Sequence, residues 1–294
     1  MRKHLLLVIP AFFVSLASLP AEDRPVLRIG GSDLLGSAFE EALEDFAREY
    51  EIDMQVELRG TYAASTALED GRLDLGLMAV PAGTNPGPEG FDAHVVAYQT
   101  AVLAINSSNP LNELNLSQAA GIYGAEELTS FTRWGDLGLD GDLRPRSIAM
   151  HSIEAGSSIA VELFRHEVLR TPRLRGTVTF HRTPAAAITA VEDSAAAIAL
   201  LPQSPPPGSP LRVLALARNQ GEIAFGPSRE NVHSGDYPIR LPVYLVFSPE
   251  SREPLRDLLL FLTRERVAEA IEAAGLLSLP ASARNRQRLE FERF

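Results

Sequence analysis

The chain has 294 residues, no cysteine and a formal net charge of −11 at pH 7. An acidic surface of this kind argues against nucleic acids and anionic membranes as partners. Without cysteine the chain has no disulfides and no lipid-modified cysteine, so it depends on its hydrophobic core, which this length can supply.

Residues 1–21 have the features of a cleavable export signal. Arg2 and Lys3 precede an apolar run that is shorter than the ~20 apolar residues of a membrane-spanning helix. Small residues then precede the bond after Ala21, where we expect cleavage. Loss of the two basic residues takes the charge from −11 to −13. We expect an exported, periplasmic or secreted protein.

The first segment after the signal combines a strand, a turn and a helix. Residues 26–29 predict a short buried strand, Gly30 and Gly31 a tight turn, and Ser32 and Asp33 the cap of a helix. Such a turn directs free backbone N–H groups and the positive end of a helix dipole at one place, which suits a small anion. A capped helix that binds nothing explains the same pattern.

Strand and helix patterns continue to alternate along the chain. Residues 54–58 predict a strand, 60–64 a second turn into a helix, and 71–78 a turn and a third strand. Residues 81–90 predict a loop rich in proline and glycine, and 95–105 an extended segment. The alternation predicts an α/β fold with open sheets.

The C-terminal third predicts one strand and one long helix. Residues 203–210 form a proline-rich loop, and 241–247 a strongly apolar strand. Residues 254–274 predict a single long helix that returns to cover the first sheet, because leucine, valine and isoleucine recur along one face. We expect the last dozen residues, rich in arginine and glutamate, to be a solvated tail.

Several short motifs occur in a fixed order. They are Gly31-Ser32-Asp33-Leu34-Leu35, Gly60-Thr61, Asp74-Leu75-Gly76, Ala104-Ile105-Asn106, Leu116-Ser117, Ile122-Tyr123-Gly124 before Trp134, and Gly235-Asp236-Tyr237-Pro238. In this order the chain resembles the type II periplasmic solute-binding proteins of ABC transporters, and among them the phosphate-binding branch. The resemblance covers residues 26–280.

The resemblance implies a two-lobed α/β protein with an open sheet in each lobe and a ligand cleft between them. Residues 26–102 and 236–294 would form lobe 1, and residues 103–235 lobe 2. The implied function is capture of a small, phosphate-like oxyanion outside the cytoplasm and its delivery to the permease of an ABC transporter. Such a protein is not an enzyme, needs no metal or cofactor, and does not insert into the membrane.

By position in the family, six residues would contact the ligand. Lobe 1 would supply Ser32, Thr61 and Asp74; lobe 2 would supply Gly156, Ser157 and Ser158. An ionised carboxylate only accepts hydrogen bonds, so Asp74 would select a ligand that still carries a proton, as monohydrogen phosphate does and sulfate does not.

The chain departs from the family where an arginine is expected in lobe 2. Ser152 stands in its place, and no base follows the Asp74-Leu75-Gly76 motif either. Three explanations stay open. His151 or Arg182 could substitute for the arginine, or the ligand could be less charged than phosphate. Alternatively, the protein could be an accessory or sensory adaptor with a degenerate cleft that acts through protein–protein contact.

Enzymatic chemistry has little support in the sequence. There is no Gly-x-Ser-x-Gly elbow, and His151 and Ser152, as neighbours on a strand, point to opposite faces. The six histidines do not show metal-ligand spacing.

Overall fold

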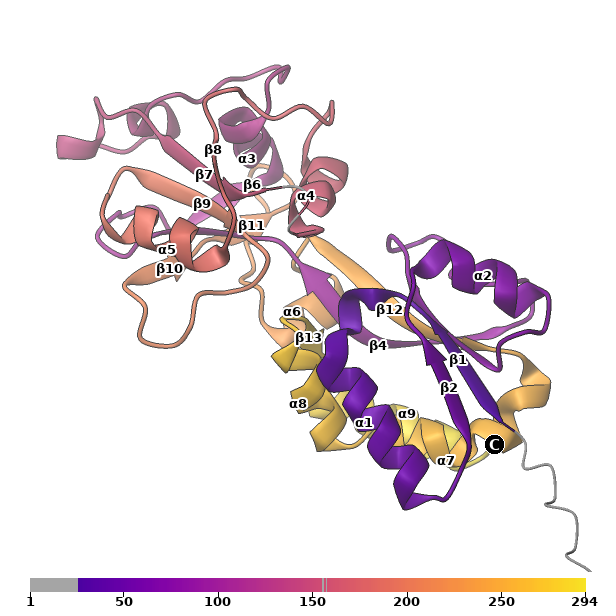
Figure 1. The fold of residues 1–294 in the computed structure, drawn as a ribbon. Coiled ribbons are helices and arrows are strands. Elements are labelled where there is room, and N and C mark those ends of the chain that lie inside the picture. Colours follow the sequence, from indigo (N-terminus) through magenta and orange to yellow (C-terminus); the bar gives the residue numbers. More distant parts are fainter. Residues whose placement is uncertain (1–25, 155, 157) are drawn as a thin grey trace, which may run out of the picture.

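The structure is a computed structural model that describes residues 26–154, 156 and 158–294. The expected export signal lies outside these residues. The described chain forms two lobes, each with its own sheet and its own hydrophobic core (Figure 1). The predicted α/β class is confirmed.

Lobe 1 is built on a six-stranded mixed sheet in the order β13-β4-β12-β3-β1-β2. β1 is parallel to β2 and to β3, whereas β12 is antiparallel to both β3 and β4. The strands are β1 (Leu27–Gly31), β2 (Met54–Glu57), β3 (Leu75–Ala79), β4 (Asp92–Thr100), β12 (Arg240–Phe247) and β13 (Leu277–Ser278).

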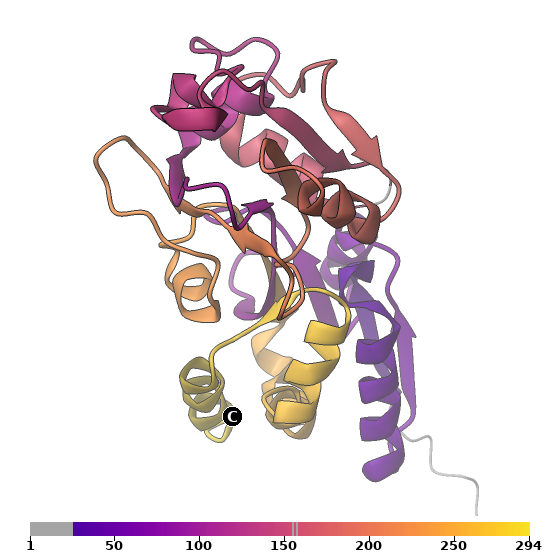
Figure 2. The same ribbon diagram turned by 90° about the vertical axis from the view of Figure 1, so that its left-hand side faces the viewer.

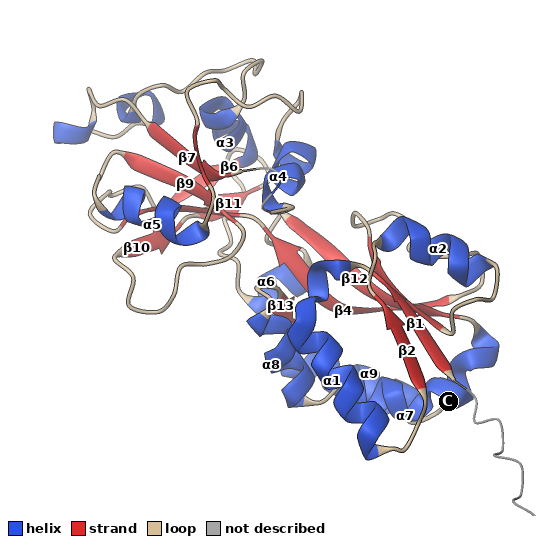
Figure 3. Cartoon of the chain, viewed as in Figure 1, coloured by secondary structure: helices blue, strands red, loops and turns tan. Residues whose placement is uncertain are grey.

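Helices cover both faces of this sheet (Figure 3). On one face, α2 (Thr61–Glu69) buries Ala64 and Leu68 against Met78 and Val246. The other face carries the main core of the lobe and is covered by α1 (Gly36–Glu49), α7 (Arg252–Leu262), α8 (Glu265–Ala273) and α9 (Ala281–Phe291).

Lobe 2 is built on a five-stranded sheet in the order β10-β5-β9-β7-β8, with a separate two-stranded ribbon β11-β6. The strands are β5 (Val102–Asn106), β6 (Glu113–Asn115), β7 (Ala149–Ile153), β8 (Thr179–His181), β9 (Ala197–Leu201), β10 (Leu211–Val213) and β11 (Ala215–Ala217). The helices are α3 (Leu116–Tyr123), α4 (Ala160–Val168) and α5 (Pro184–Glu192). α6 (Arg229–Ser234) lies beside β13 of lobe 1 (Figure 1), and its Arg229 pairs with Glu272 of α8.

The chain crosses between the lobes at Ala101, between β4 and β5, and returns just before β12 (Figure 2). The buried Tyr237 hydroxyl donates to the carbonyl oxygen of Ala101 at 2.8 Å and so ties the two crossings together. Beside them, the Tyr98 hydroxyl lies 3.1 Å from Nδ1 of His233. The single extended segment expected at 95–105 is therefore two strands, broken where the chain changes lobes.

The long helix expected at 254–274 is wrong: the structure has two helices, α7 and α8, separated at Thr263 and Arg264. Arg264 has extended backbone angles, φ −70° and ψ 155°. The reason lies in the apolar spacing. Leu262 and Val267 are both buried but five positions apart, which a continuous helix cannot place on one face.

The solvated tail expected at the C-terminus is also wrong, because residues 281–291 form α9. Phe291 is fully buried in the core of lobe 1, and its ring lies 4.9 Å from that of His94. The charged residues of α9 occupy the remaining face of an anchored helix. One buried aromatic in a highly charged segment was too weak a pattern to predict it.

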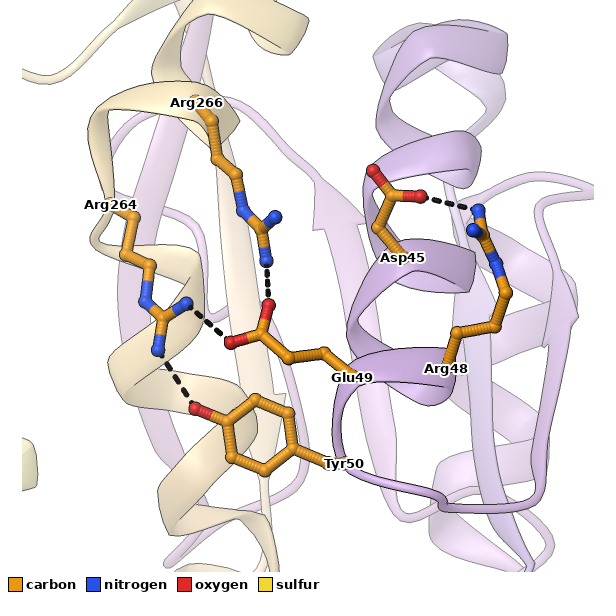
Figure 4. A network of polar contacts seen from close by, with 6 residues as sticks. All are labelled: Asp45, Arg48, Glu49, Tyr50, Arg264 and Arg266. Carbon is orange, nitrogen blue, oxygen red and sulfur yellow. Dashed lines mark hydrogen bonds and ion pairs between the residues drawn. The ribbon is translucent and has the colours of Figure 1, made fainter.

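An ion-pair network holds the end of α1 to the break between α7 and α8 (Figure 4). The Glu49 carboxylate accepts hydrogen bonds from Arg264 at 3.1 Å and Arg266 at 2.6 Å, and Arg264 also donates to the Tyr50 hydroxyl at 2.8 Å. These arginines hold the pKa of the Glu49 carboxyl below its usual value. The network fixes the far end of α1, the helix whose start faces lobe 2.

Phe291→Ala tests whether α9 is an anchored part of lobe 1. Removing a buried phenylalanine ring should lower the free energy of unfolding by about 3–5 kcal/mol. Leu289→Ala on the same helix is the matched control, because Leu289 is 59% exposed. Urea denaturation measures both. Equal, small effects of the two substitutions would mean that α9 does not contribute to the core.

Candidate functional site

The carboxyl ends of parallel strands from both lobes face each other at the seam. β1 leads into α1 in lobe 1, while β7 leads toward α4 and β8 into α5 in lobe 2. Gly31 makes the first of these turns possible. Its φ is +156°, and a Cβ atom there would lie 2.3 Å from the carbonyl oxygen of Leu77. Ligands of open α/β sheets bind at such carboxyl ends.

A pocket of about 510 Å³ lies at this seam and takes its walls from both lobes. Lobe 1 contributes residues around the start of α1, namely Asp33, Leu34, Gly36, Ser37 and Ala38. Lobe 2 contributes Ser158 and Ile159 before α4, Pro184 at the start of α5, and Pro202 and Gln203 after β9. Ala273, Ala274 and Gly275, at the end of α8, close a third side.

Backbone dipoles from several helix ends meet at this pocket. α1, α4 and α5 all begin at its wall, and the first N–H groups of a helix have no partner inside the helix. The N-cap residues of α1 and α4 make no side-chain cap hydrogen bond, but the N–H of Ala160 in α4 donates to Ser158 Oγ, and Pro184 at the start of α5 has no N–H. α8 ends beside the start of α1, where a Cβ atom on Gly36 would lie 3.2 Å from Cβ of Ala274, and it brings its negative end there.

Asp33 is the one charged side chain among the described residues that line the pocket. It is exposed, and its carboxylate has no hydrogen-bond or ion-pair partner among those residues. No described lining residue is arginine, lysine or histidine. A dianion would therefore meet a carboxylate in the pocket and no side-chain counter-charge.

Gln99 supplies a buried polar group to the same wall. It lies on β4, immediately before the crossing, and is 6% exposed. Its Nε2 donates to the carbonyl oxygens of Thr100 at 2.7 Å and Pro202 at 2.9 Å, which joins the two lobes. Its Oε1 has no partner among the residues that the structure describes. The sequence analysis missed Gln99. The signal that could have found it is the polar pair Gln99-Thr100 at the end of an otherwise apolar strand.

Ser32 and Thr61, both predicted to contact the ligand, lie at the carboxyl edge of the lobe 1 sheet, and their hydroxyls have partners in the protein. The buried Ser32 Oγ accepts from the N–H of Leu34 at 3.3 Å and caps a short 3₁₀ turn, Asp33–Leu35. Thr61 Oγ1 accepts from the N–H of Ala79 at 3.0 Å. Neither residue lines the pocket.

Asp74 lies at the other edge of that sheet. It directly precedes β3, and β3 runs parallel to β1, so Asp74 is at the opposite end from Ser32. Its carboxylate accepts from the backbone N–H of Arg28 at 2.8 Å and from the guanidinium at 2.9 Å. Burial alone would raise the pKa of this carboxyl, but Arg28 outweighs burial and lowers it. The structure does not bring Asp74 together with the other predicted residues.

In lobe 2, Ser158 is the predicted residue that lines the pocket, and its Oγ accepts from the N–H of Ala160 at 3.1 Å. Gly156 is exposed outside it, and Ser157 lies outside the described residues. Ser152 occupies the position where the resemblance places an arginine. It is fully buried and does not line the pocket.

The two bases considered as substitutes lie elsewhere. His151 Nδ1 is 3.0 Å from Nε2 of His181, and burial followed by that neighbour lowers the pKa of His151. Neither His151 nor Arg182 lines the pocket. The part of the chain that the structure describes has no group of three or more potential metal ligands. It also has no helix with the length and apolarity needed to cross a membrane.

Asp74→Asn should destabilise the fold and leave ligand binding unchanged. Loss of the Arg28 pairing should lower the free energy of unfolding by about 1 kcal/mol at pH 7. Because the folded pKa is lowered, this contribution is complete above about pH 4 and disappears as the pH falls through the folded pKa. Urea denaturation at pH 7 and pH 3 measures the difference.

The matched control for Asp74→Asn is Asp140→Asn, since the Asp140 side chain is 87% exposed and pairs with Arg144 on the surface. It should change stability little at either pH. A loss of anion binding in Asp74→Asn without a loss of stability would return Asp74 to the ligand site.

Comparisons with known proteins agree with this architecture. PstS from Borrelia burgdorferi superposes with a TM-score of 0.71 at 15% identity, covering 87% of this chain and 99% of that one. A possible phosphate binding protein from Planctomyces limnophilus gives 0.69 at 14% identity, covering 92% and 98%. An ABC-type phosphate transport receptor from Vibrio cholerae gives 0.63 at 19% identity, covering 86% and 100%.

These identities establish a shared fold. No curated protein sequence matches the chain. A family model described as the PBP superfamily domain matches residues 18–266, most of the chain. The resemblance seen in the sequence motifs is thereby confirmed, and the chain belongs to the PBP superfamily, with the two-lobed fold of the phosphate-binding proteins of ABC transporters.

Proposed function

We propose that this chain is an extracytoplasmic solute-binding protein that captures a small solute bearing an oxyanionic group between its lobes and delivers it to an ABC transporter. The observation that carries the proposal is the interlobe pocket, with the starts of α1, α4 and α5 in its walls. Family membership supports the receptor role, and two of the similar structures are a possible phosphate binding protein and an ABC-type phosphate transport receptor.

The backbone, rather than a basic side chain, would hold the anionic group. N–H groups at the starts of helices bind carboxylates and phosphates, and the positive ends of the helix dipoles add to the attraction. Ser37 and Ser158 at the same wall can donate further hydrogen bonds. The acidic net charge of −11 does not prevent this, because surface charges more than about 10 Å away are screened in salt.

Binding and release, without chemical conversion of the solute, fit the side chains present. The described pocket residues include no histidine, lysine or arginine that could act as a base beside Ser37 or Ser158. The histidines His151, His166, His181 and His233 of the described residues contact His181, Glu167, His151 and Tyr98, and none of them lines the pocket. Export through the signal expected at residues 1–21 would place the receptor where a solute arrives from outside.

Ala38→Tyr tests whether the interlobe pocket is the binding site. Ala38 lines the pocket from the first turn of α1, and a tyrosine side chain there would fill part of its 510 Å³. A thermal-shift panel of inorganic phosphate, sulfate and small organic acids is measured on both proteins. A ligand at a hundredfold excess over its Kd stabilises the wild type by about 2.7 kcal/mol, and Ala38→Tyr should abolish that shift.

The matched control for Ala38→Tyr is Glu41→Tyr, an exposed position on the same helix outside the pocket. It should retain the full ligand-dependent shift. If no panel member shifts the wild type, the receptor proposal fails and an adaptor that acts through protein contact takes its place. If a shift survives in Ala38→Tyr, the binding site lies elsewhere.

A further inference from the structure

We infer that lobe 2 carries a second binding site, for a small hydroxylated organic anion such as a sugar acid or a sugar phosphate, at the edge of its sheet that faces away from the interlobe pocket. The site is a cavity lined by Arg175, by residues with hydroxyl groups and by a few small or apolar residues. It is independent of the proposed receptor function, because it shares no lining residue with the interlobe pocket.

The position of the cavity separates it from the seam between the lobes. Its volume is about 620 Å³, within the range of about 300–1,000 Å³ that is typical of pockets for small organic ligands. Ser147 and Ile148, in its wall, directly precede β7, and Thr177 lies just before β8. β7 and β8 are parallel, and the chain leaves their other ends toward Ser158 and Pro184 of the interlobe pocket. The two cavities therefore lie at opposite edges of the same sheet.

The end of α3 holds Arg175 in the cavity wall. Its Nε donates to the carbonyl oxygen of Gly124 at 3.0 Å, and its Nη2 donates to the carbonyl oxygen of Gly121 and to Ser130 Oγ, both at 2.6 Å. A guanidinium has five N–H donors, and the two on Nη1 of Arg175 have no partner among the described residues. Because the other donors already fix the group, a ligand that pairs with Nη1 does not have to order it.

Arg175 has no counter-ion in the part of the chain that the structure describes. Its partners are neutral carbonyl and hydroxyl oxygens. Burial lowers the pKa of the Arg175 guanidinium, and no acidic group of the described residues is close enough to raise it. Glu127, the one acidic residue among the described residues of the wall, accepts instead from the backbone N–H of Arg170 at 2.9 Å. A half-buried cation without a counter-charge favours an anionic ligand.

Hydroxyl groups make up much of the remaining wall. The residues that carry them are Ser130, Thr132, Ser147 and Thr177. The hydroxyls of Ser147 and Thr177 have no partner among the described residues. A hydroxyl both donates and accepts hydrogen bonds, so these side chains match the hydroxyl groups of a carbohydrate. Ile148 and Met150 add apolar surface, against which the C–H groups of such a ligand can pack.

Gly176, in the same wall, allows a test that leaves Arg175 and its contacts with α3 intact. A Cβ atom at Gly176 would meet nothing within 4 Å beyond its neighbours in the chain, and its φ is not positive, so a side chain fits there. Gly176→Glu adds a carboxylate at the cavity wall, and Gly176→Gln is the matched control of equal size without the charge. Similar melting temperatures without ligand check that both variants fold.

Titration calorimetry compares compounds that separate the anionic group from the hydroxylated body. D-gluconate and D-glucose 6-phosphate have both, D-glucose has the body alone, and inorganic phosphate has the anion alone. At least one of the first two should bind the wild type about tenfold or more tightly than glucose and phosphate, because charge-assisted hydrogen bonds are among the stronger polar contacts. Gly176→Glu should weaken that compound about tenfold or more and Gly176→Gln about threefold or less, since like charges repel. Ala38→Tyr, which fills part of the interlobe pocket, should leave its Kd unchanged.

The contrary outcomes are distinguishable. If neither gluconate nor glucose 6-phosphate binds the wild type more tightly than glucose and phosphate do, the cavity does not take a hydroxylated anion. Equal effects of Gly176→Glu and Gly176→Gln would remove charge from the recognition and overturn the assignment to Arg175. Loss of binding in Ala38→Tyr, with binding retained in Gly176→Glu, would place the compound in the interlobe pocket. That result would overturn the second site and leave the receptor function standing.

Discussion

The structure depends on one constraint, which is that the chain must cross twice between two separate hydrophobic cores. The crossings at Ala101 and before β12 are tied together by the Tyr237 hydroxyl and by the amide of Gln99, which bonds to lobe 2 through Pro202. The apolar side chains are buried in these cores, whereas polar groups and helix ends lie at the seam. The seam is therefore where the proposed solute would bind.

Helix termini contribute more to the electrostatics of this seam than charged side chains do. Helix starts from both lobes and a helix end surround a pocket in which Asp33 is the one charged side chain described. Arginine is plentiful in the chain, but Arg28 pairs with Asp74, and Arg264 and Arg266 pair with Glu49, all of them away from the pocket. No arginine is among the described residues that line the pocket.

Much of the fold could be predicted from the sequence, because strand and helix periodicity in residues 26–80 is strong and local. The strand, glycine turn and helix start around Ser32 were among the features predicted from this part of the sequence. What failed depends on long-range geometry. The motif Asp74-Leu75-Gly76 does not reveal that β3 runs parallel to β1. This direction places Asp74, at the start of β3, beside Arg28 and at the sheet edge opposite Ser32. Burial of Ser152 and Phe291, and the contribution of Gln99 to the seam, likewise follow from partners distant in sequence.

The most direct test of the account is a crystal structure of the protein grown with the most stabilising ligand of the thermal-shift panel. The account predicts electron density for that ligand in the pocket between the lobes, at the start of α1. Ligand density at Asp74 and Arg28, or on the outer face of either lobe with the seam empty, would contradict it.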